Sequence, residues 1–315
     1  MASVLNNRYA VILALAMIVA VLPLTFPTSY YLRVASLVWV SAFAAIGLNL
    51  LMGKAGQVSL GHAAFFGVGA YAVAIGPTHL GVPSWASALV GAGLSALLAF
   101  VVGRPILRLK GHYLAIATLG FGVLVALVIT TENRWTGGPD GMAVAKLAVF
   151  GWRVSTAYAW YWVSGAFMVL GTWIALNLDD TPTGRAFLAL HDSEIAARVA
   201  GIDVASFKLR AFVLAAVYAS IAGSLLAMMN GFVSPDLAGF QHSVELVTMV
   251  VLGGLGSIVG SVVGAAVLVV LPQMLTVFQE YENVMLGLII IASMVFMRDG
   301  IVPTARKFLA KAIAR

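Results

Sequence analysis

The stretch GKAGQVSLGHAAFFGVGAYA, residues Gly53–Ala72, interrupts an otherwise apolar sequence with polar and flexible residues. Glycine fills five of its twenty positions, and a lysine, a glutamine, a serine and a histidine lie among them. Inside a membrane, backbone that is not helical is stable only where protein or a water-filled cavity surrounds it. The stretch therefore predicts either a hinge or pathway lining at the inner mouth of a membrane protein, or an ordinary inner loop before a tightly packed small-residue helix.

The composition of the 315-residue chain explains why a membrane is invoked at all. Hydrophobic residues make up 62% of the sequence and charged residues 10%, with a mean hydropathy of +1.02. A soluble domain carries about 25% charged residues, so this chain lacks the polar surface to cover a water-soluble globule. We therefore predict an all-α polytopic membrane protein with glycine-broken helices. The absence of cysteine excludes disulfides, thiolate zinc sites and cysteine nucleophiles.

Apolar segments of spanning length recur along the chain. About 20 apolar residues cross the hydrocarbon core, which predicts one transmembrane domain, residues 1–315, with about ten spans and a range of eight to ten. The apolar region Ser243–Leu271 is divided at Gly253–Ser257, because clustered glycines weaken a helix. The expected spans are 9–26, 34–52, 62–76, 85–103, 113–131, 157–177, 209–229, 243–256, 258–276 and 284–297.

The distribution of basic residues predicts the orientation. With the N-terminus inside, fourteen of the 18 Lys and Arg residues fall in inner segments, as the positive-inside rule requires. An even number of spans also places the basic tail after Arg298 inside, so both termini are expected in the cytoplasm. The net charge of +6 lies beside apolar spans rather than in one patch, which indicates topology and not nucleic-acid binding.

Two segments outside the expected spans are notable. The inner one, about 179–210, is the longest stretch dense in charge. The outer one, about 132–156, contains TGGPDG at Thr136–Gly141, which is turn chemistry.

Two glycine-rich regions resemble each other. Residues 50–71 and 247–268 both read as apolar helix, glycine-rich break and small-residue helix. We call residues 53–61 the first break and residues 253–257 the second break. Transporters are often built from internal repeats with broken helices, but small residues also permit close helix packing, and both interpretations stay open.

Catalytic and metal-dependent functions find little support in the sequence. Ser59 lies near His62, but no acid in the neighbourhood completes a triad. His62 and His112 have no second ligand at a useful spacing, so no metal site is expected. Carriers coupled to protons or ions usually show ionisable residues within their spans, and this chain has few.

The chain also lacks an ATP-binding P-loop. Its only Gly-Lys pair, Gly53-Lys54, has Leu48 where the first glycine of the motif belongs and Ala55 where Ser or Thr belongs. If transport is driven by ATP, hydrolysis is expected in a partner chain, and this chain is not itself an enzyme.

Five motifs follow one another in a fixed order. They are GLNLLMGKAGQVSLGHAAFFGVGAYA at 47–72, LRLKGHYLAIATLGFG at 107–122, TGGPDG at 136–141, GRAFLALHDSEIAARVAGIDVASFKLRAFVLAA at 184–216 and VVLGGLGSIVGSVVGAA at 250–266. The first closely resembles the signature of branched-chain amino-acid ABC transporter permeases, and the second and third resemble the LivM type. The resemblance runs over nearly the whole chain; the first thirty residues and the tail after Arg298 add little.

The resemblance implies a function and a set of partners. It implies a permease subunit in a bacterial inner membrane that imports branched-chain or other small apolar amino acids by alternating access. The implied partners are a second related permease in a heterodimer, two cytoplasmic ATPases that bind ATP and magnesium, and a periplasmic substrate-binding protein. No cofactor is expected in this chain itself. Related permeases also serve urea, short amides and aromatic carboxylates, and a stand-alone secondary carrier or channel is the alternative of a different class.

The inner segment then becomes a candidate for coupling to the ATPase. Permeases of this kind dock a short helix with the pattern EAA, three residues, then Gly. Here Ile195, Ala196, Ala197 and Gly201 fit that spacing, but Glu194 lies one residue early and Ile195 takes the usual acidic position. The Asp-Ser-Glu tripeptide ending at Glu194 is a helix N-terminal signal and Gly201 a stop signal. The two alanines are expected to let a partner surface approach closely.

The glycine breaks are the candidates for the translocation pathway or its hinges. The amides, the hydroxyl and the imidazole there offer hydrogen-bonding groups, and the glycines permit bending. The predicted pathway or hinge residues are Asn49, Gly53, Gly56, Gln57, Ser59, Gly61, His62, Gly253, Gly254 and Gly256.

Overall fold

A computed structural model of the protein describes residues 8–26, 28–149, 152–275, 287, 291, 297 and 299–313. Helices dominate this part of the chain, in agreement with the predicted all-α polytopic fold. Six of them are long and apolar enough to cross a membrane. These are α2 (Arg8–Thr25), α3 (Ser29–Asn49) with its π-helical continuation η1 (Leu50–Lys54), α5 (Ser84–Ile106), α6 (His112–Thr131), α8 (Ala157–Asp179) and α11 (Val204–Asn230).

Shorter elements complete the bundle. The helices are α4 (His62–His79), α7 (Asn133–Thr136), α9 (Pro182–Asp192), α10 (Glu194–Val199), α12 (Phe240–Gly253), α13 (Ile258–Leu275) and α15 (Ile301–Ile313), with 3-10 turns η2 (Gly138–Asp140) and η3 (Pro235–Ala238). Two antiparallel pairs of very short strands join β1 (Met142–Ala143) to β4 (Phe232–Val233) and β2 (Ala148–Val149) to β3 (Trp152–Arg153).

Nine of the ten expected spans fall on helices of the structure. The expected span 284–297 lies outside the described residues except at positions 287, 291 and 297, so the count of ten stays a prediction. α12 has 14 residues, which is about 21 Å at 1.5 Å per residue and is shorter than the roughly 30 Å core of a bilayer. The break at 253–257 is therefore a genuine interruption between two helices, as predicted.

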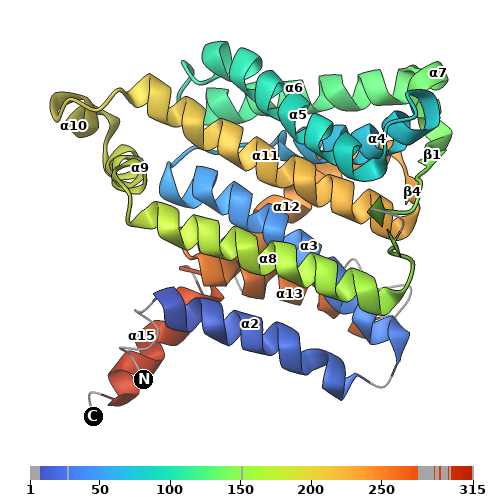
Figure 1. Ribbon diagram of the computed structural model, residues 1–315. Helices are drawn as coiled ribbons and strands as arrows, with labels where there is room; N and C mark the ends of the chain where they lie inside the picture. The colour runs from blue at the N-terminus through green and yellow to red at the C-terminus, as the bar shows by residue number, and fades with distance from the viewer. Residues whose placement is uncertain are drawn as a thin grey trace.

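α3 and α11 form the centre of the bundle. Buried residues make up 83% of the most apolar 18-residue segment of α3 with η1 and 67% of that of α11. The corresponding shares are 17% in α2 and 22% in α6. Figure 1 shows α11 and α3 running through the middle, with α5 and α6 on one side and α2 on the other. Small residues allow this packing: a Cβ on Gly69 of α4 would lie 1.9 Å from the carbonyl oxygen of Ser220 on α11.

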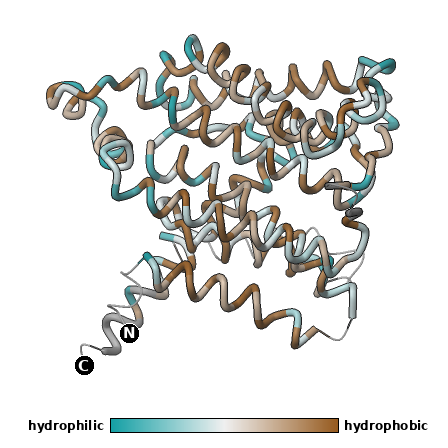
Figure 2. Tube along the Cα trace, in the orientation of Figure 1, coloured by the Kyte–Doolittle hydropathy of each residue, from teal (hydrophilic) through white to brown (hydrophobic). Residues whose placement is uncertain are grey.

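The two ends of the bundle separate the segments that the charge pattern assigns to opposite sides of the membrane. One end of the bundle carries α9, α10 and the N-terminus of α2, where Arg8 pairs with Asp180. At the opposite end lie α7 and the β1–β4 pair, and there the ring of His79 packs 5.1 Å from that of Trp135 at a tilt of 56°. In Figure 2 hydrophobic residues dominate along the long helices, and hydrophilic residues gather around the connecting segments.

Candidate functional site

The two glycine breaks, far apart in sequence, meet at the end of the bundle where α9 lies. The side chain of Asn49, the last residue of α3, is 1% exposed and fastens the second break. Its Nδ2 donates to the Ser257 carbonyl at 2.9 Å and to Ser261 Oγ at 2.7 Å, and its Oδ1 accepts from the Gly256 N–H at 2.8 Å. These bonds use both the nitrogen and the oxygen of the side-chain amide. Asn49 therefore holds the α12–α13 turn against the end of α3.

Close backbone contacts explain the glycines around this lock. A Cβ on Gly53 would lie 2.1 Å from the Gly256 nitrogen, and one on Gly253 would lie 1.9 Å from the Gly260 carbonyl oxygen. Gly254 (φ +120°) and Gly256 (φ +78°) adopt backbone conformations that side chains disfavour. At these four positions the structure supports the packing and turn interpretation that the sequence left open.

The first break connects η1 to α4 through irregular backbone. Lys54 at the end of η1 pairs with Asp179 at the end of α8 at 2.8 Å. Gly56 (φ +67°) faces α9, where a Cβ would come 3.2 Å from His191 Cα. Gly61 is the N-cap residue directly before α4, and a Cβ there would lie 1.9 Å from the Thr118 carbonyl oxygen of α6. The first break therefore extends from α9 at Gly56 to α6 at Gly61. The lack of a side chain at Gly61 lets the backbone pack directly against α6.

Polar atoms along this segment lack partners although they are buried. Gln57, Ser59 and His62 are each at most 2% exposed. Within the described part of the chain, Gln57 Oε1, Ser59 Oγ and both ring nitrogens of His62 make no hydrogen bond. Buried polar atoms in native proteins normally have a partner, in the protein or in water, so these three side chains offer hydrogen-bonding groups that the described part of the chain does not use.

The beginnings of α4 and α12 meet beside this cluster. The Ala63 N–H donates to Ser243 Oγ at 3.0 Å, and the His242 ring lies 4.6 Å from that of Phe66. α12 begins within reach of α4 and ends at the second break, so it reaches only part of the way between the two ends of the bundle. Interrupted helices of this kind are typical of transporters.

The inner segment contains a short helix, α10, with the ends that the sequence predicts, while its coupling role stays a prediction. Ser193 Oγ accepts from the Ala196 N–H at 3.2 Å and caps the start. At the other end Gly201 has φ +82°, its N–H donates to the Arg198 carbonyl at 3.1 Å, and the Ile202 N–H donates to the Ala197 carbonyl at 3.0 Å. This pair of bonds is a Schellman motif, so the stop signal at Gly201 is confirmed.

The faces of α10 correct one expectation. Ala197 is 2% exposed and packs with Leu190 of α9 and Val204 of α11, so it faces its own chain and not a partner. The surface available to a partner is apolar: Ile195 is 76% and Val199 84% exposed. Ala196 is exposed between them. Ile195, the departure from the acidic pattern, therefore belongs to this exposed surface.

Lys208 is the residue that sequence reasoning missed. Its ammonium forms an ion pair with Glu194 of α10, and its carbonyl accepts from Gln57 Nε2 at 3.3 Å. In the sequence, Lys208 is distinguished only as one of the fourteen basic residues expected on the inner side. One residue of α11 thus contacts both α10 and the first break, which local sequence patterns do not reveal because the partners lie 14 and 151 positions away.

The described residues hold no group of three or more His, Cys, Asp or Glu side chains placed to bind a metal ion. What they hold instead is an apolar bundle of helices long enough to span a membrane, two glycine breaks that meet at the α9 end of that bundle, and a short capped helix at the same end. These features define a multi-pass transport permease.

Comparison with known proteins places the chain in a family. It belongs to the branched-chain amino acid transport system / permease component family, whose model matches residues 30–294. It is 33% identical over 297 residues to the high-affinity branched-chain amino acid transport system permease protein LivM of Escherichia coli K12, covering 87% of this chain and 70% of that protein. The predicted LivM-type resemblance is confirmed.

Other relatives are more distant. LivH of Salmonella typhimurium, a high-affinity branched-chain amino acid transport system permease, is 25% identical over 82% of this chain and 90% of its own length. The fructose import permease FrcC of Rhizobium meliloti is 29% identical over 67% of this chain and 62% of its own length. No solved structure matches.

Proposed function

We propose that this chain is the membrane-spanning permease subunit of an ABC importer that carries branched-chain or other small apolar amino acids into the cytoplasm. The observation that carries the proposal is the connection from α10 through Lys208 to Gln57. It gives a helix at the end of the bundle a direct mechanical contact with the first break. Partner ATPases that move α10 would thereby change the packing of the first break and drive alternating access.

The proposed orientation places α9 and α10 in the cytoplasm. Its support is the excess of basic residues in the segments that gather at that end, including Arg8, Lys54 and Lys208. Both termini are then cytoplasmic, the outer segment 132–156 is a periplasmic loop, and the protein resides in a bacterial inner membrane with ten spans.

The proposed partners follow from what the chain contains and lacks. Its similarity to both LivM and LivH of enteric bacteria supports pairing with a second, related permease. Because the chain has no P-loop, two ATPase subunits would bind ATP and magnesium and dock on the exposed Ile195 and Val199. A periplasmic binding protein would deliver the substrate.

Within the chain we assign different roles to the two breaks. Gln57, Ser59 and His62 are proposed to line the path, because their polar atoms are buried without protein partners. Asn49, Gly53, Gly254 and Gly256 form the fixed turn against which the first break moves.

The test is reconstitution. The tagged chain is purified in mild detergent together with the chains that accompany it, placed in liposomes, and assayed for leucine uptake with and without ATP. We expect a second permease and two P-loop ATPases to co-purify and uptake to require ATP. Urea, a short amide, an aromatic carboxylate and fructose serve as competing substrates and would redirect the substrate assignment. Uptake by the chain alone without ATP would make it a secondary carrier or channel.

A further inference from the structure

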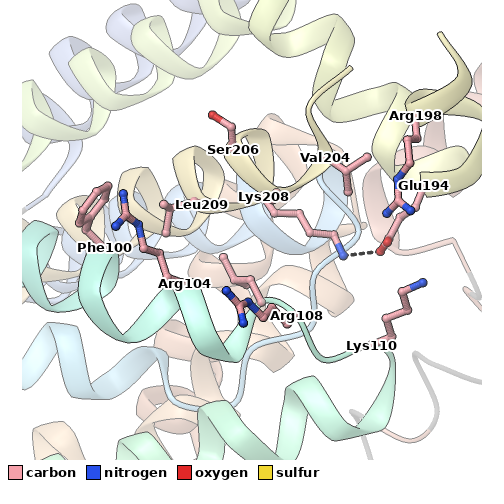
Figure 3. A pocket seen from close by; sticks show the side chains of 12 residues that line it. Phe100, Arg104, Arg108, Lys110, Glu194, Arg198, Val204, Ser206, Lys208 and Leu209 are labelled. Atoms are coloured by element: carbon pink, nitrogen blue, oxygen red, sulfur yellow. Dashed lines mark hydrogen bonds and ion pairs between the residues drawn. The ribbon is translucent and has the colours of Figure 1, made fainter. Parts of the chain in front are cut away.

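A cavity of about 690 Å³ opens at the α10 end of the bundle, between the ends of α5, α10 and α11. Figure 3 shows basic side chains from all three helices and from the α5–α6 turn around it. We call it the basic cavity, and its charged residues are Arg104, Arg108, Lys110, Arg198, Lys208 and Glu194.

The charges in the basic cavity are unbalanced. Five basic groups face one carboxylate, and that carboxylate, Glu194, is already paired with Lys208. Within the described part of the chain, the other four basic side chains form no ion pair. Arg104 lies over the ring of Phe100 at 4.2 Å, which positions its guanidinium at the cavity rim. Clustered like charges in a cavity attract an anion, and guanidinium groups match phosphate oxygens in pairs.

The surface next to the cavity indicates which phosphate compound fits. Leu97, Val101 and Arg104 follow one another at helical spacing on α5, so they lie on one face. Leu97 and Val101 are exposed, and so are Tyr113 and Ile116 near the start of α6. An apolar strip on spanning helices that ends in arginines suits a molecule with an acyl chain and an anionic head. Free phosphate or a nucleotide would use the charges and leave the strip without a role.

We propose that the basic cavity binds the headgroup of an anionic phospholipid of the inner leaflet, with the acyl chains along the exposed strip of α5. This inference rests on the proposed function, which places the α10 end at the cytoplasmic side. Basic pockets between spanning helices on that side are suited to anionic lipid heads. Because Arg198 and Glu194 belong to α10, a bound headgroup also joins the coupling helix to α5.

The experiment measures lipid binding directly, without ATP, substrate or partners. The full-length chain in mild detergent is titrated with phosphatidylglycerol, phosphatidylethanolamine or inorganic phosphate, and bound lipid is counted by native mass spectrometry. We expect phosphatidylglycerol to bind about tenfold more tightly than phosphatidylethanolamine, given several basic contacts at the surface. Equal retention of the two lipids overturns the proposal, and so does displacement of phosphatidylglycerol by millimolar inorganic phosphate, which would indicate a free-anion site.

Variants locate the binding to this cavity. Arg104→Gln with Arg108→Gln removes two charges and is expected to weaken phosphatidylglycerol binding about tenfold. Lys110→Gln, a single change at an exposed position that does not threaten folding, is expected to weaken it severalfold. Arg33→Gln with Arg134→Gln removes two charges from segments assigned to the other side of the membrane and is expected to change nothing. Equal losses in both double variants would contradict the assignment. Lipid binding is measured without transport, so a failure of the reconstituted transport assay does not affect it. The proposed transport function and the proposed lipid site can therefore be contradicted independently.

Discussion

The two breaks are both rich in glycine, but they differ in hydrogen bonding. The polar groups at the second break have protein partners, and several of those at the first do not. In the second break, the polar groups of the α12–α13 turn are tied to Asn49, and its glycines are filled in by neighbouring backbone. In the first break, Gln57 Oε1 and Ser59 Oγ are buried without partners among the described residues, and so are the ring nitrogens of His62 directly after it. Glycine content alone therefore does not distinguish a fixed turn from a path. The two breaks differ instead in whether the neighbouring polar groups have hydrogen-bond partners, and the proposed path at the first break rests on that difference.

The largest effect is expected where the two breaks touch. In Gly53→Ala the new methyl group would lie 2.1 Å from the Gly256 nitrogen and from Asn49 Oδ1. Overpacking costs about 1–3 kcal/mol and occasionally more, and we expect about 3 kcal/mol because backbone has to move. Unfolding of the purified chain in detergent measures it. Gly93→Ala on α5, where the added carbon meets nothing within 4 Å, is the control and should leave stability unchanged or slightly raised. Equal behaviour of the two variants would remove the close-contact interpretation.

The next effect tests the lock itself. Asn49→Leu keeps the branched arrangement of four side-chain heavy atoms but leaves the Gly256 N–H without its acceptor and removes the donors to Ser261 Oγ and the Ser257 carbonyl. Each buried unsatisfied group costs about 1–3 kcal/mol, so we expect a loss of about 2–3 kcal/mol in the same unfolding assay. Ser261→Ala removes one of these contacts and should cost about 1 kcal/mol. A loss no greater in Asn49→Leu than in Ser261→Ala would mean that the amide is not the centre of the turn.

The connection between α10 and the first break should matter more for transport than for stability. Lys208→Met breaks the ion pair with Glu194, in which the Lys208 side chain is 6% and the Glu194 side chain 29% exposed. The methionine fills the buried space of the lysine stem and water reaches the remaining carboxylate, so we expect a stability cost of about 1–2 kcal/mol. Coupling between two sites is typically worth 5–150-fold, and we expect ATP-dependent uptake to fall about tenfold. Uptake at the wild-type rate in reconstituted complexes would show that α10 acts on the bundle by another route.

A serine pair separates lining from packing. Ser59→Ala removes a buried hydroxyl that has no protein partner, so stability should change by no more than about 0.5 kcal/mol. Uptake should nevertheless fall severalfold if Ser59 lines the path. Ser95 on α5 also carries a buried hydroxyl without a partner among the described groups, and Ser95→Ala should affect neither quantity. If Ser59→Ala and Ser95→Ala transport equally well, the first break is packing like the second.

The smallest effect on stability is expected at the exposed surface of α10. Ile195→Asp with Val199→Asp changes side chains that face solvent, so the free energy of unfolding should stay within about 0.5 kcal/mol. Co-purification of the ATPase should be lost, because the apolar contact is replaced by charge. Leu80→Asp, an exposed leucine at the opposite end of the bundle, is the control and should retain the ATPase. Retention by the α10 variant as well would place docking elsewhere.

Local signals explain what the sequence predicted correctly. The ends of α10 follow from Ser193 and Gly201, each of which acts on backbone groups within a few positions. Nine expected spans fall on helices for the same reason, since apolar length and glycine clusters are read within one segment. The family resemblance rested on motifs of this local kind.

Long-range contacts explain what the sequence did not predict. Asn49 meets Gly256 across 207 positions, and β1 pairs with β4 through strands of two residues that carry no pattern. Ala197 was expected to face a partner because a small side chain allows close approach. The sequence does not show which side of α10 this residue occupies. Burial against Leu190 and Val204 depends on how α9 and α11 converge, which no sequence period shows.

The length of α10 has a consequence for how its surface is presented. A helix of six residues is far below the roughly 12–15 that are marginally stable alone in water. It persists because of its cap, its Schellman end and the burial of Ala197. If Ala197 leaves its place between α9 and α11, the helix should unravel with it as one cooperative unit. The surface of Ile195 and Val199 is thus available only while α9, α10 and α11 stay packed, and amide hydrogen exchange should show residues 194–200 opening together.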